Sequence, residues 1–267
     1  MKGIVNCIYD PIPPFHFIRK AVGFPVFPRP SEMSDMTVLA VAGALDGIAL
    51  AADGRRTDAS GRFVSDKAQK IWHNVCDGFD LVVGWTGSST LYAESGASFS
   101  FPEIAEKVWL SLRMERMPEI FSEFSSKVKD ELQLFLNENV GSGQSKISVT
   151  HTTALVGIFI AERPICATLG FWTEDTVANS TSPIVETLIG DFADLATGSF
   201  YLWEKRRYKW PSDKNTSLKN AVVELREYVQ ECIDNENLVP DCKGFGGHLH
   251  LATVDRDGFR WEIPPAQ

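Results

Sequence analysis

The sequence has little of what marks several classes of protein. Its five cysteines include no CxxC pair, which disfavours a zinc knuckle and a dense disulfide framework. Basic residues are outnumbered, 26 Lys and Arg against 35 Asp and Glu, and the net charge of -9 argues against nucleic acid or an anionic membrane as a partner. No apolar run approaches the roughly 18 residues that a membrane helix needs. We therefore expect a cytoplasmic protein. The cysteines are Cys7, Cys76, Cys166, Cys232 and Cys242.

Residues 1–36 differ in character from the rest of the chain. Arg19 and Lys20 divide their apolar part, which does not fit a secretory signal. Prolines interrupt the segment, so it can hold neither a regular helix nor a central strand. These prolines are Pro11, Pro13, Pro14, Pro25, Pro28 and Pro30.

Two interpretations of this segment remain open. It is a propeptide, or the start of translation is assigned too early and translation begins at Met33 or Met36. Both place Thr37 near the mature N-terminus. We expect one domain over residues 37–267, which is 267 - 36 = 231 residues.

The chain after Thr37 has the pattern of antiparallel β-hairpins. Two apolar runs, residues 38–44 and 48–52, surround Asp46-Gly47, a strong hairpin signal. A third run leads through Lys67 to Trp72, turns near Asp77-Gly78 and returns as residues 79–85, which predicts a second hairpin beside the first. The remaining predicted strands cover residues 154–161, 165–171, 247–254 and 259–261.

Between these strands the apolar residues change to helical spacing. Pro102 and Pro118 open two helices. Helix resumes after Gly190, and a last helix over about residues 217–233 follows a capping cluster at Asn215-Thr216-Ser217. This order of strands and helices predicts an α+β fold, a four-layer αββα sandwich of two antiparallel sheets flanked by helices.

The stretch from Thr37 to Arg56 resembles the opening of a proteasome β-type subunit. Its letters TVLAVAGALDGIALAADGRR all but reproduce the family's threonine, glycine and Ala-Asp-Ser-Arg pattern. The similarity continues through SDKAQKI at residues 65–71, GWTGS at 84–88 and GGHLHL at 246–251. The resemblance implies an N-terminal-nucleophile (Ntn) hydrolase, similar to the bacterial proteasome-like peptidase that works with an ATP-driven unfoldase.

The resemblance implies catalytic roles for four residues. Thr37 falls on the family's nucleophile, Asp53 on its acidic partner, Lys70 on its catalytic lysine and Gly87 on the glycine whose N–H faces the oxyanion. The Thr37 hydroxyl would attack an amide carbonyl, with its own α-amine as the base. The Lys70 ammonium, held by Asp53, would stabilise the alkoxide-like oxygen, and the Gly87 N–H would stabilise the tetrahedral oxyanion.

Two positions depart from the family's pattern. Asp191 stands where the family has a serine in its Gly-Ser-Gly stretch, and Phe245 replaces the serine that precedes Gly246 in a late Asp-x-x-Ser-Gly motif. Asp241 lies close to the expected acid of that motif and is the fifth candidate for a catalytic residue. Because Met36 precedes Thr37, removal of an initiator methionine suits this chain better than cleavage after a propeptide glycine.

The turn of the first hairpin decides whether Thr37 and Asp53 share a face. A two-residue turn at Asp46-Gly47 would pair Asp53 with Ala40, on the face opposite Thr37. A three-residue turn over residues 45–47 would pair Asp53 with Leu39 and restore the face of Thr37. The proposed site therefore predicts the three-residue turn.

These observations favour a threonine-type endopeptidase subunit that acts on peptides or unfolded protein inside a homo-oligomeric ring. One alternative is a catalytically silent, structural proteasome-like subunit, which Asp191 and Phe245 favour. Another is an Ntn amidase acting on a small amide. His248 and His250 have ligand-like spacing on one face of a strand, but no Cys or carboxylate partner is evident, so we expect no metal and no other cofactor.

Overall fold

The structure is a computed structural model, and all of its described residues belong to the unit Met33–Gln267. The described residues are 37–57, 62–93, 95–114, 119–139, 151–174, 177–181, 184–187, 195–197, 202, 216–238, 242 and 244–266. The predictions for residues 1–36, Asp191 and Asp241 lie outside them.

Strands β1 (Leu39–Ala44) and β2 (Gly47–Ala52) form the first predicted hairpin, and every residue of both is buried. One face of the hairpin packs against helix α4 (Leu218–Asp234) and the other against a second sheet. Alanines on the α4 face leave room for the helix backbone, whereas branched side chains fill the space between the sheets. The alanines are Ala40, Ala42, Ala44, Ala49 and Ala51; the branched residues are Leu39, Val41, Ile48 and Leu50.

The hairpin lies in a five-stranded antiparallel sheet of order β13-β1-β2-β14-β15. β14 (His250–Asp255) and β15 (Gly258–Ile263) are the predicted last hairpin. β13 (Leu195–Thr197) pairs with β1. The helix expected after Gly190 therefore does not include these residues, because their backbone pairs with the edge of this sheet.

The second predicted hairpin lies in the other sheet. Its strands β5 (Ile71–Cys76) and β6 (Phe79–Gly87) are joined by Asp77 and Gly78, both with positive φ, as a type I′ hairpin turn requires. This hairpin packs against the first one across the two sheets but does not extend its sheet, since β6 pairs with β5 and with β9 (His151–Ile160). Of the run that leads through Lys67 to Trp72, the part from Ile71 onward pairs with β6.

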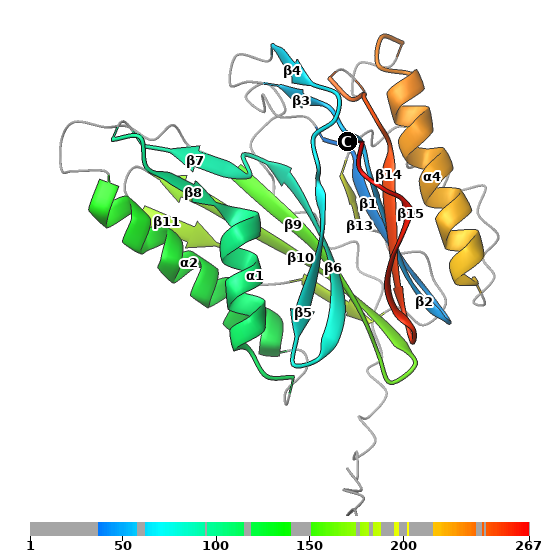
Figure 1. Ribbon diagram of the computed structural model, residues 1–267, viewed down its shortest axis with the longest axis horizontal. Coiled ribbons are helices and arrows are strands. Elements are labelled where there is room, and N and C mark those ends of the chain that lie inside the picture. The colour runs from blue at the N-terminus through cyan, green and yellow to red at the C-terminus, as the bar shows by residue number, and fades with distance from the viewer. Residues whose placement is uncertain are drawn as a thin grey trace, which may run out of the picture. The chain divides into compact units, whose positions relative to one another are not determined.

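The six-stranded sheet has the order β11-β10-β9-β6-β5, with β12 paired to β10. All of its pairings are antiparallel. Two small two-stranded sheets, β3 with β4 and β7 with β8, accompany it (Figure 1). The bounds are β9 His151–Ile160, β10 Arg163–Glu174, β11 Val177–Ser180, β12 Ile184–Thr187, β3 Arg56–Thr57, β4 Phe63–Ser65, β7 Thr90–Tyr92 and β8 Ser98–Ser100.

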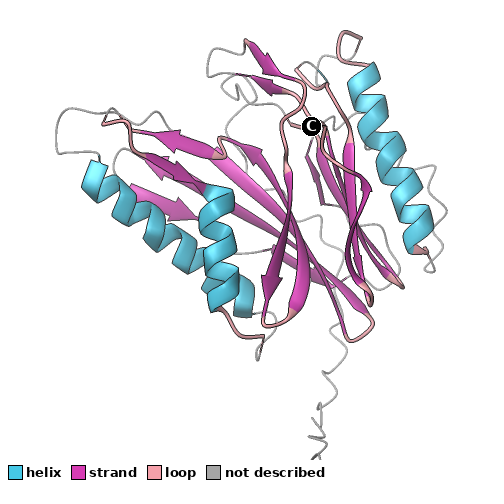
Figure 2. Cartoon of the chain, in the orientation of Figure 1, coloured by secondary structure: helices cyan, strands magenta, loops and turns pink. Residues whose placement is uncertain are grey.

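Helices α1 (Phe101–Ser111) and α2 (Glu119–Asn139) pack against the six-stranded sheet on the side away from the first hairpin (Figure 2). Pro102 stands in the first turn of α1, where its missing N–H costs no hydrogen bond. Trp109 of α1 stacks on Phe124 of α2 with ring centroids 4.0 Å apart. Neither these helices nor any other described helix combines the length and apolar character needed to cross a membrane.

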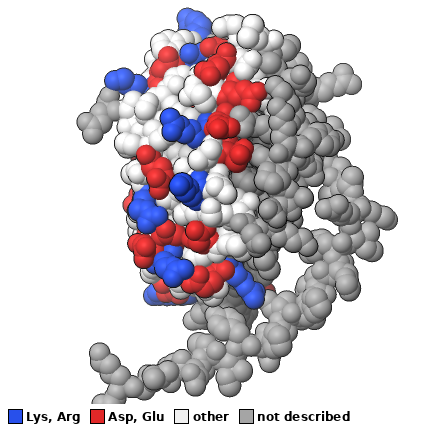
Figure 3. Space-filling view, turned by 90° about the vertical axis from the view of Figure 1, so that its right-hand side faces the viewer, with Lys and Arg blue, Asp and Glu red and all other residues white. Residues whose placement is uncertain are grey.

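Two glycines let the sheets approach each other. A Cβ at Gly84 of β6 would lie 2.4 Å from Leu39 Cδ1, and one at Gly157 of β9 would lie 2.6 Å from Ile48 Cγ2. Side chains of the first hairpin therefore fill the space that these glycines leave. The predicted α+β fold with antiparallel sheets is confirmed. On the α4 side of the molecule the surface carries charges of both signs, interspersed (Figure 3).

Candidate active site

The first hairpin brings Thr37 and Asp53 to its open end. Ala44 pairs with Gly47 and Leu39 pairs with Ala52, so the turn consists of Leu45 and Asp46. The predicted three-residue turn is therefore wrong, and so is the pairing of Asp53 with Leu39. Asp53 instead lies opposite Val38, and its backbone N–H donates to the Val38 carbonyl at 3.2 Å.

The carboxylate of Asp53 nevertheless reaches the side of the hairpin on which Thr37 lies. Thr37, Val38 and Asp53 stand just outside the regular strands, where the alternation of side chains no longer fixes their direction. Asp53 Oδ1 accepts a hydrogen bond from the Val38 N–H at 3.2 Å. The carboxylate thus turns back across the end of the hairpin.

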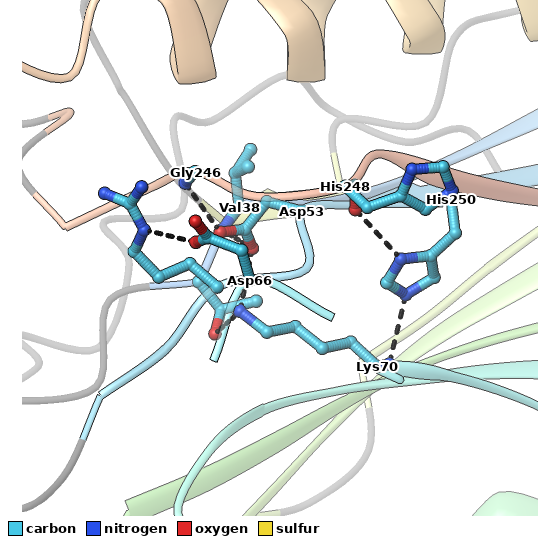
Figure 4. A network of polar contacts seen from close by, with 9 residues as sticks. Val38, Asp53, Asp66, Lys70, Gly246, His248 and His250 are labelled. Atoms are coloured by element: carbon cyan, nitrogen blue, oxygen red, sulfur yellow. Dashed lines mark hydrogen bonds and ion pairs between the residues drawn. The ribbon is translucent and has the colours of Figure 1, made fainter. Parts of the chain in front are cut away.

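Lys70 joins the two residues. Its Nζ donates to Thr37 Oγ1 at 2.8 Å and to Asp53 Oδ1 at 2.8 Å, as Figure 4 shows for the ammonium and the carboxylate. Lys70 comes directly before β5 of the six-stranded sheet, whereas Thr37 and Asp53 flank the first hairpin of the five-stranded sheet. All three residues are buried, with at most 8% of any of them exposed. The site therefore forms where the two sheets meet.

Asp53 is fully buried and surrounded by donors. Its Oδ2 accepts the Gly246 N–H at 3.0 Å, in addition to the bonds from Val38 and Lys70 to Oδ1. Burial raises the pKa of the Asp53 carboxyl, whereas the Lys70 ammonium and the backbone N–H groups of Gly246 and Arg55 act in the opposite direction. Because each of these groups donates, together they select the ionised carboxylate as their acceptor.

Arg55 fixes the segment that carries the Gly246 N–H. Its Nε donates to Asp66 Oδ1 at 2.8 Å and its Nη1 to Glu236 Oε1. A Cβ at Gly246 would lie 2.4 Å from the Arg55 guanidinium carbon, so glycine allows the backbone to pass directly against the arginine. Arg55 therefore ties the end of α4 and the Asp66 loop to the segment around Gly246.

Gly87 is the last residue of β6 and has a φ of +82°. A Cβ there would lie 2.2 Å from the His151 carbonyl oxygen, so the position has neither the conformation nor the space for another residue. Two residues earlier, the Trp85 N–H donates to the Lys70 carbonyl at 2.9 Å. β6 thus contacts the Lys70 backbone at Trp85 and ends two residues later at Gly87. The role of Gly87 as oxyanion donor stays a prediction.

Solved structures have a fold similar to this one. A mutant of Anbu from Hyphomicrobium sp. strain MC1 is 14% identical, with 84% of each chain covered and a TM-score of 0.50. The chain has a proteasome-like Ntn-hydrolase fold. Anbu (ancestral beta-subunit) from Yersinia bercovieri is 13% identical over 84% of this chain and 87% of that chain, also with a TM-score of 0.50.

The sequence matches no protein-family model and no curated protein. At so low an identity the structural likeness shows the Ntn-hydrolase fold alone. The chemistry of this chain must therefore be argued from its own residues, above all from Thr37, Asp53 and Lys70.

Within this fold Phe245 occupies a place in the core. Its side chain is 2% exposed and belongs to the cluster that packs beneath α4. A hydroxyl that the family's pattern would place at this position is replaced by a buried apolar ring. Asp241 and Asp191, the other residues concerned by the departures from the pattern, lie outside the described residues.

The two histidines considered as metal ligands do not converge. His248 Nε2 faces the Pro264 carbonyl at 2.8 Å, whereas His250 Nε2 accepts the Lys70 backbone N–H at 3.0 Å. The described part of the chain contains no group of three or more His, Cys, Asp or Glu side chains suited to a metal ion. Sequence reasoning missed the contact of His250 with Lys70 and the contacts of Arg55, although both residues stand in the stretches that resemble the family.

Proposed function

We propose that the protein is a threonine-dependent peptidase of the Ntn type, built as a complete αββα sandwich. The observation that supports this most directly is the position of Lys70 Nζ, 2.8 Å from both Thr37 Oγ1 and Asp53 Oδ1. A buried ammonium beside a hydroxyl favours the negative charge that develops on the oxygen as it attacks. The ion pair of Lys70 with Asp53 is not a surface salt bridge, because neither side chain is exposed by more than 9%.

The reaction begins when the Thr37 oxygen attacks an amide carbonyl of the substrate. The α-amine of Thr37 takes the hydroxyl proton, and an oxyanion forms on the former carbonyl. As this intermediate collapses, the protonated α-amine gives its proton to the leaving nitrogen, the amine portion of the substrate departs, and an ester remains on Thr37. Water then hydrolyses the ester. While Met36 remains attached, the base is an amide and the site is inert.

The substrate is a peptide or an unfolded protein, and the enzyme is a ring of identical chains served by an ATP-driven unfoldase. The likeness to a protein described as an ancestral β-subunit supports this proposal. A ring would confine a threonine that cleaves ordinary amide bonds and so protect folded proteins from it.

A catalytically silent subunit is the second candidate. The buried ring of Phe245, where the family's pattern has a serine, favours it. In that case Lys70 and Asp53 would serve only as a buried ion pair that joins the two sheets.

Intact mass and covalent trapping together test the proposal. The full chain is expressed, weighed and treated with a peptide electrophile that bonds to both the oxygen and the amine of an N-terminal threonine. We expect a mature chain that begins at Thr37 and gains one adduct. Thr37→Ala should abolish the adduct, and Thr37→Ser should keep it. An unlabelled chain that begins at Met1 or Met36 would contradict the proposed peptidase activity and favour the catalytically silent subunit.

A further inference from the structure

His250 binds the main chain of Lys70 in a way that fixes the state of its own ring. The Lys70 N–H donates to His250 Nε2 at 3.0 Å, across 180 positions of sequence. A backbone N–H can only donate, so Nε2 must be unprotonated. The proton of the neutral ring then lies on Nδ1, which faces the His248 carbonyl at 3.4 Å (Figure 4). Only the neutral ring, in this one tautomer, makes the contact with Lys70.

His250 makes this contact from the sheet that also carries Asp53. It is the first residue of β14 and pairs with Ala52, the residue directly before Asp53. Lys70 belongs to the segment that leads into the other sheet. The five-stranded sheet therefore holds Lys70 at two points, its ammonium through Asp53 Oδ1 and its backbone through His250 Nε2.

A lysine side chain has four flexible bonds, so a fixed ammonium position needs a fixed backbone as well as a charged partner. We propose that His250 is a positioning residue for the threonine chemistry: by accepting the Lys70 N–H it holds the ammonium at Thr37 Oγ1. This inference rests on the proposed function, because it assigns His250 a part in the work of Lys70. His250 acts through the lysine rather than on the substrate.

The surroundings of the ring keep it neutral. His250 is 1% exposed, and within the described part of the chain the charged or titratable groups that act on its ring are the Lys70 ammonium and the His248 imidazole. Both would repel a positive charge on the ring. Burial lowers the pKa of His250 to about 4. The acceptor that Lys70 needs is thus present throughout the neutral range.

The first test reads the ring itself and needs no activity. In the full chain, labelled with ¹⁵N in its histidines, NMR correlations of the ring nitrogens identify the protonated nitrogen, and the spectrum of His250→Gln assigns the signals. We expect His250 to carry its proton on Nδ1 from pH 8 to pH 6. A proton on Nε2, or a ring that becomes charged near pH 6.5, would overturn the proposal.

The second test measures the rate at which the peptide electrophile labels Thr37, split into its binding constant and its limiting rate. His250→Leu removes the acceptor, and we expect the limiting rate to fall about 10- to 100-fold with little change in binding. His250→Gln offers an amide oxygen to the Lys70 N–H and should recover part of the rate. His73→Gln is the control, because His73 lies on β5 and pairs with Asp80 instead.

The outcomes separate the two proposals. If the limiting labelling rate falls equally in His250→Leu and His250→Gln, His250 has a packing role only and the positioning role is overturned. An unchanged limiting rate in His250→Leu would also overturn it. Melting curves of both variants show whether each is folded. A folded wild-type chain that is never labelled would contradict the proposed function and with it the positioning role, even where NMR confirms the contact.

Discussion

Asp53 and Val38 are joined by two hydrogen bonds at the open end of the first hairpin. The Asp53 N–H donates to the Val38 carbonyl at 3.2 Å, and the Val38 N–H donates in return to Asp53 Oδ1 at 3.2 Å. In a regular antiparallel pair the return bond goes to a backbone carbonyl. Here the carboxylate takes that place, so the ladder ends with a charged group beside Thr37. The end of the hairpin and the candidate site are thus the same structure.

Asp53→Asn should damage both the site and the fold. The substitution leaves the buried Lys70 ammonium without its anionic partner, and one of the N–H groups of Val38 and Gly246 must face an amide NH2. Breaking a buried ion pair from one side costs about 3–5 kcal/mol. We expect a loss of that size in the free energy of unfolding, measured by urea denaturation, and labelling of Thr37 slowed by at least about 100-fold.

Asp66→Asn is the matched control for this prediction. Asp66 also pairs with a cation, Arg55, but its side chain is 43% exposed, so the change should cost less than about 1 kcal/mol. If Asp53→Asn and Asp66→Asn lower the free energy of unfolding by similar amounts, the burial of Asp53 does not increase its contribution to stability.

Local patterns predict the main hairpins and the helices α1, α2 and α4, but neither β13 nor the turn between β1 and β2. Asp46-Gly47 matches a turn signal, yet Gly47 opens β2, where a Cβ would lie 2.8 Å from both Leu218 Cδ2 and the Val254 carbonyl oxygen. Asp46 uses its carboxylate to accept the Leu218 N–H at 2.6 Å, 172 positions away. Tertiary contacts with α4 and β14 therefore set the register, and no local window contains them.

The candidate site was predictable to a similar extent. The resemblance located Thr37, Asp53 and Lys70 by their order, and the structure brings these three together. The contact of His250 with Lys70 could not be foreseen, since a period of two marks a strand but does not say which element faces it. For the same reason the second hairpin could be recognised but not assigned to its sheet.

Lys70→Met should make the stability of the protein depend on pH through Asp53. Without the ammonium, burial raises the pKa of that carboxyl further, unopposed by its main charged partner. A raised pKa gives stability that is complete below the unfolded value of about 3.9 and is lost as the pH rises through the folded value. We expect the variant to be less stable at pH 8 than at pH 5, relative to wild type, in urea denaturation.

The double variant Asp53→Asn/Lys70→Met checks this reasoning. It removes both charges, so it should recover much of the stability that each single change loses. If the two losses simply add, the two residues are not coupled, and the ion pair contributes nothing beyond their separate packing.

Gly87→Ala should disturb the end of β6. Alanine would have to adopt a φ of +82° with its Cβ 2.2 Å from the His151 carbonyl oxygen, so β6 and β9 must separate locally. Gly78→Ala isolates the conformational part, since Gly78 has a φ of +85° but no atom within 4 Å of an added Cβ. We expect about 1–2 kcal/mol of destabilisation at Gly78 and a larger loss at Gly87, together with slower labelling of Thr37. Equal losses at the two glycines would contradict the close contact with His151.

His250 should make the wild-type protein lose stability in acid. Its pKa is lowered from 6.5 to about 4 in the folded chain. Between these two pH values the ring is protonated in the unfolded chain but neutral in the folded chain. The contribution of the neutral ring is complete above pH 6.5 and falls as the pH drops towards 4, by about 3 kcal/mol in all. Asp53 acts with the opposite sign, because its pKa is raised. The measurement is therefore the difference in free energy of unfolding between wild type and His250→Gln from pH 7.5 to 4. Since glutamine does not titrate, this difference should shrink as the pH falls, and a constant difference would mean that the ring titrates alike in both states.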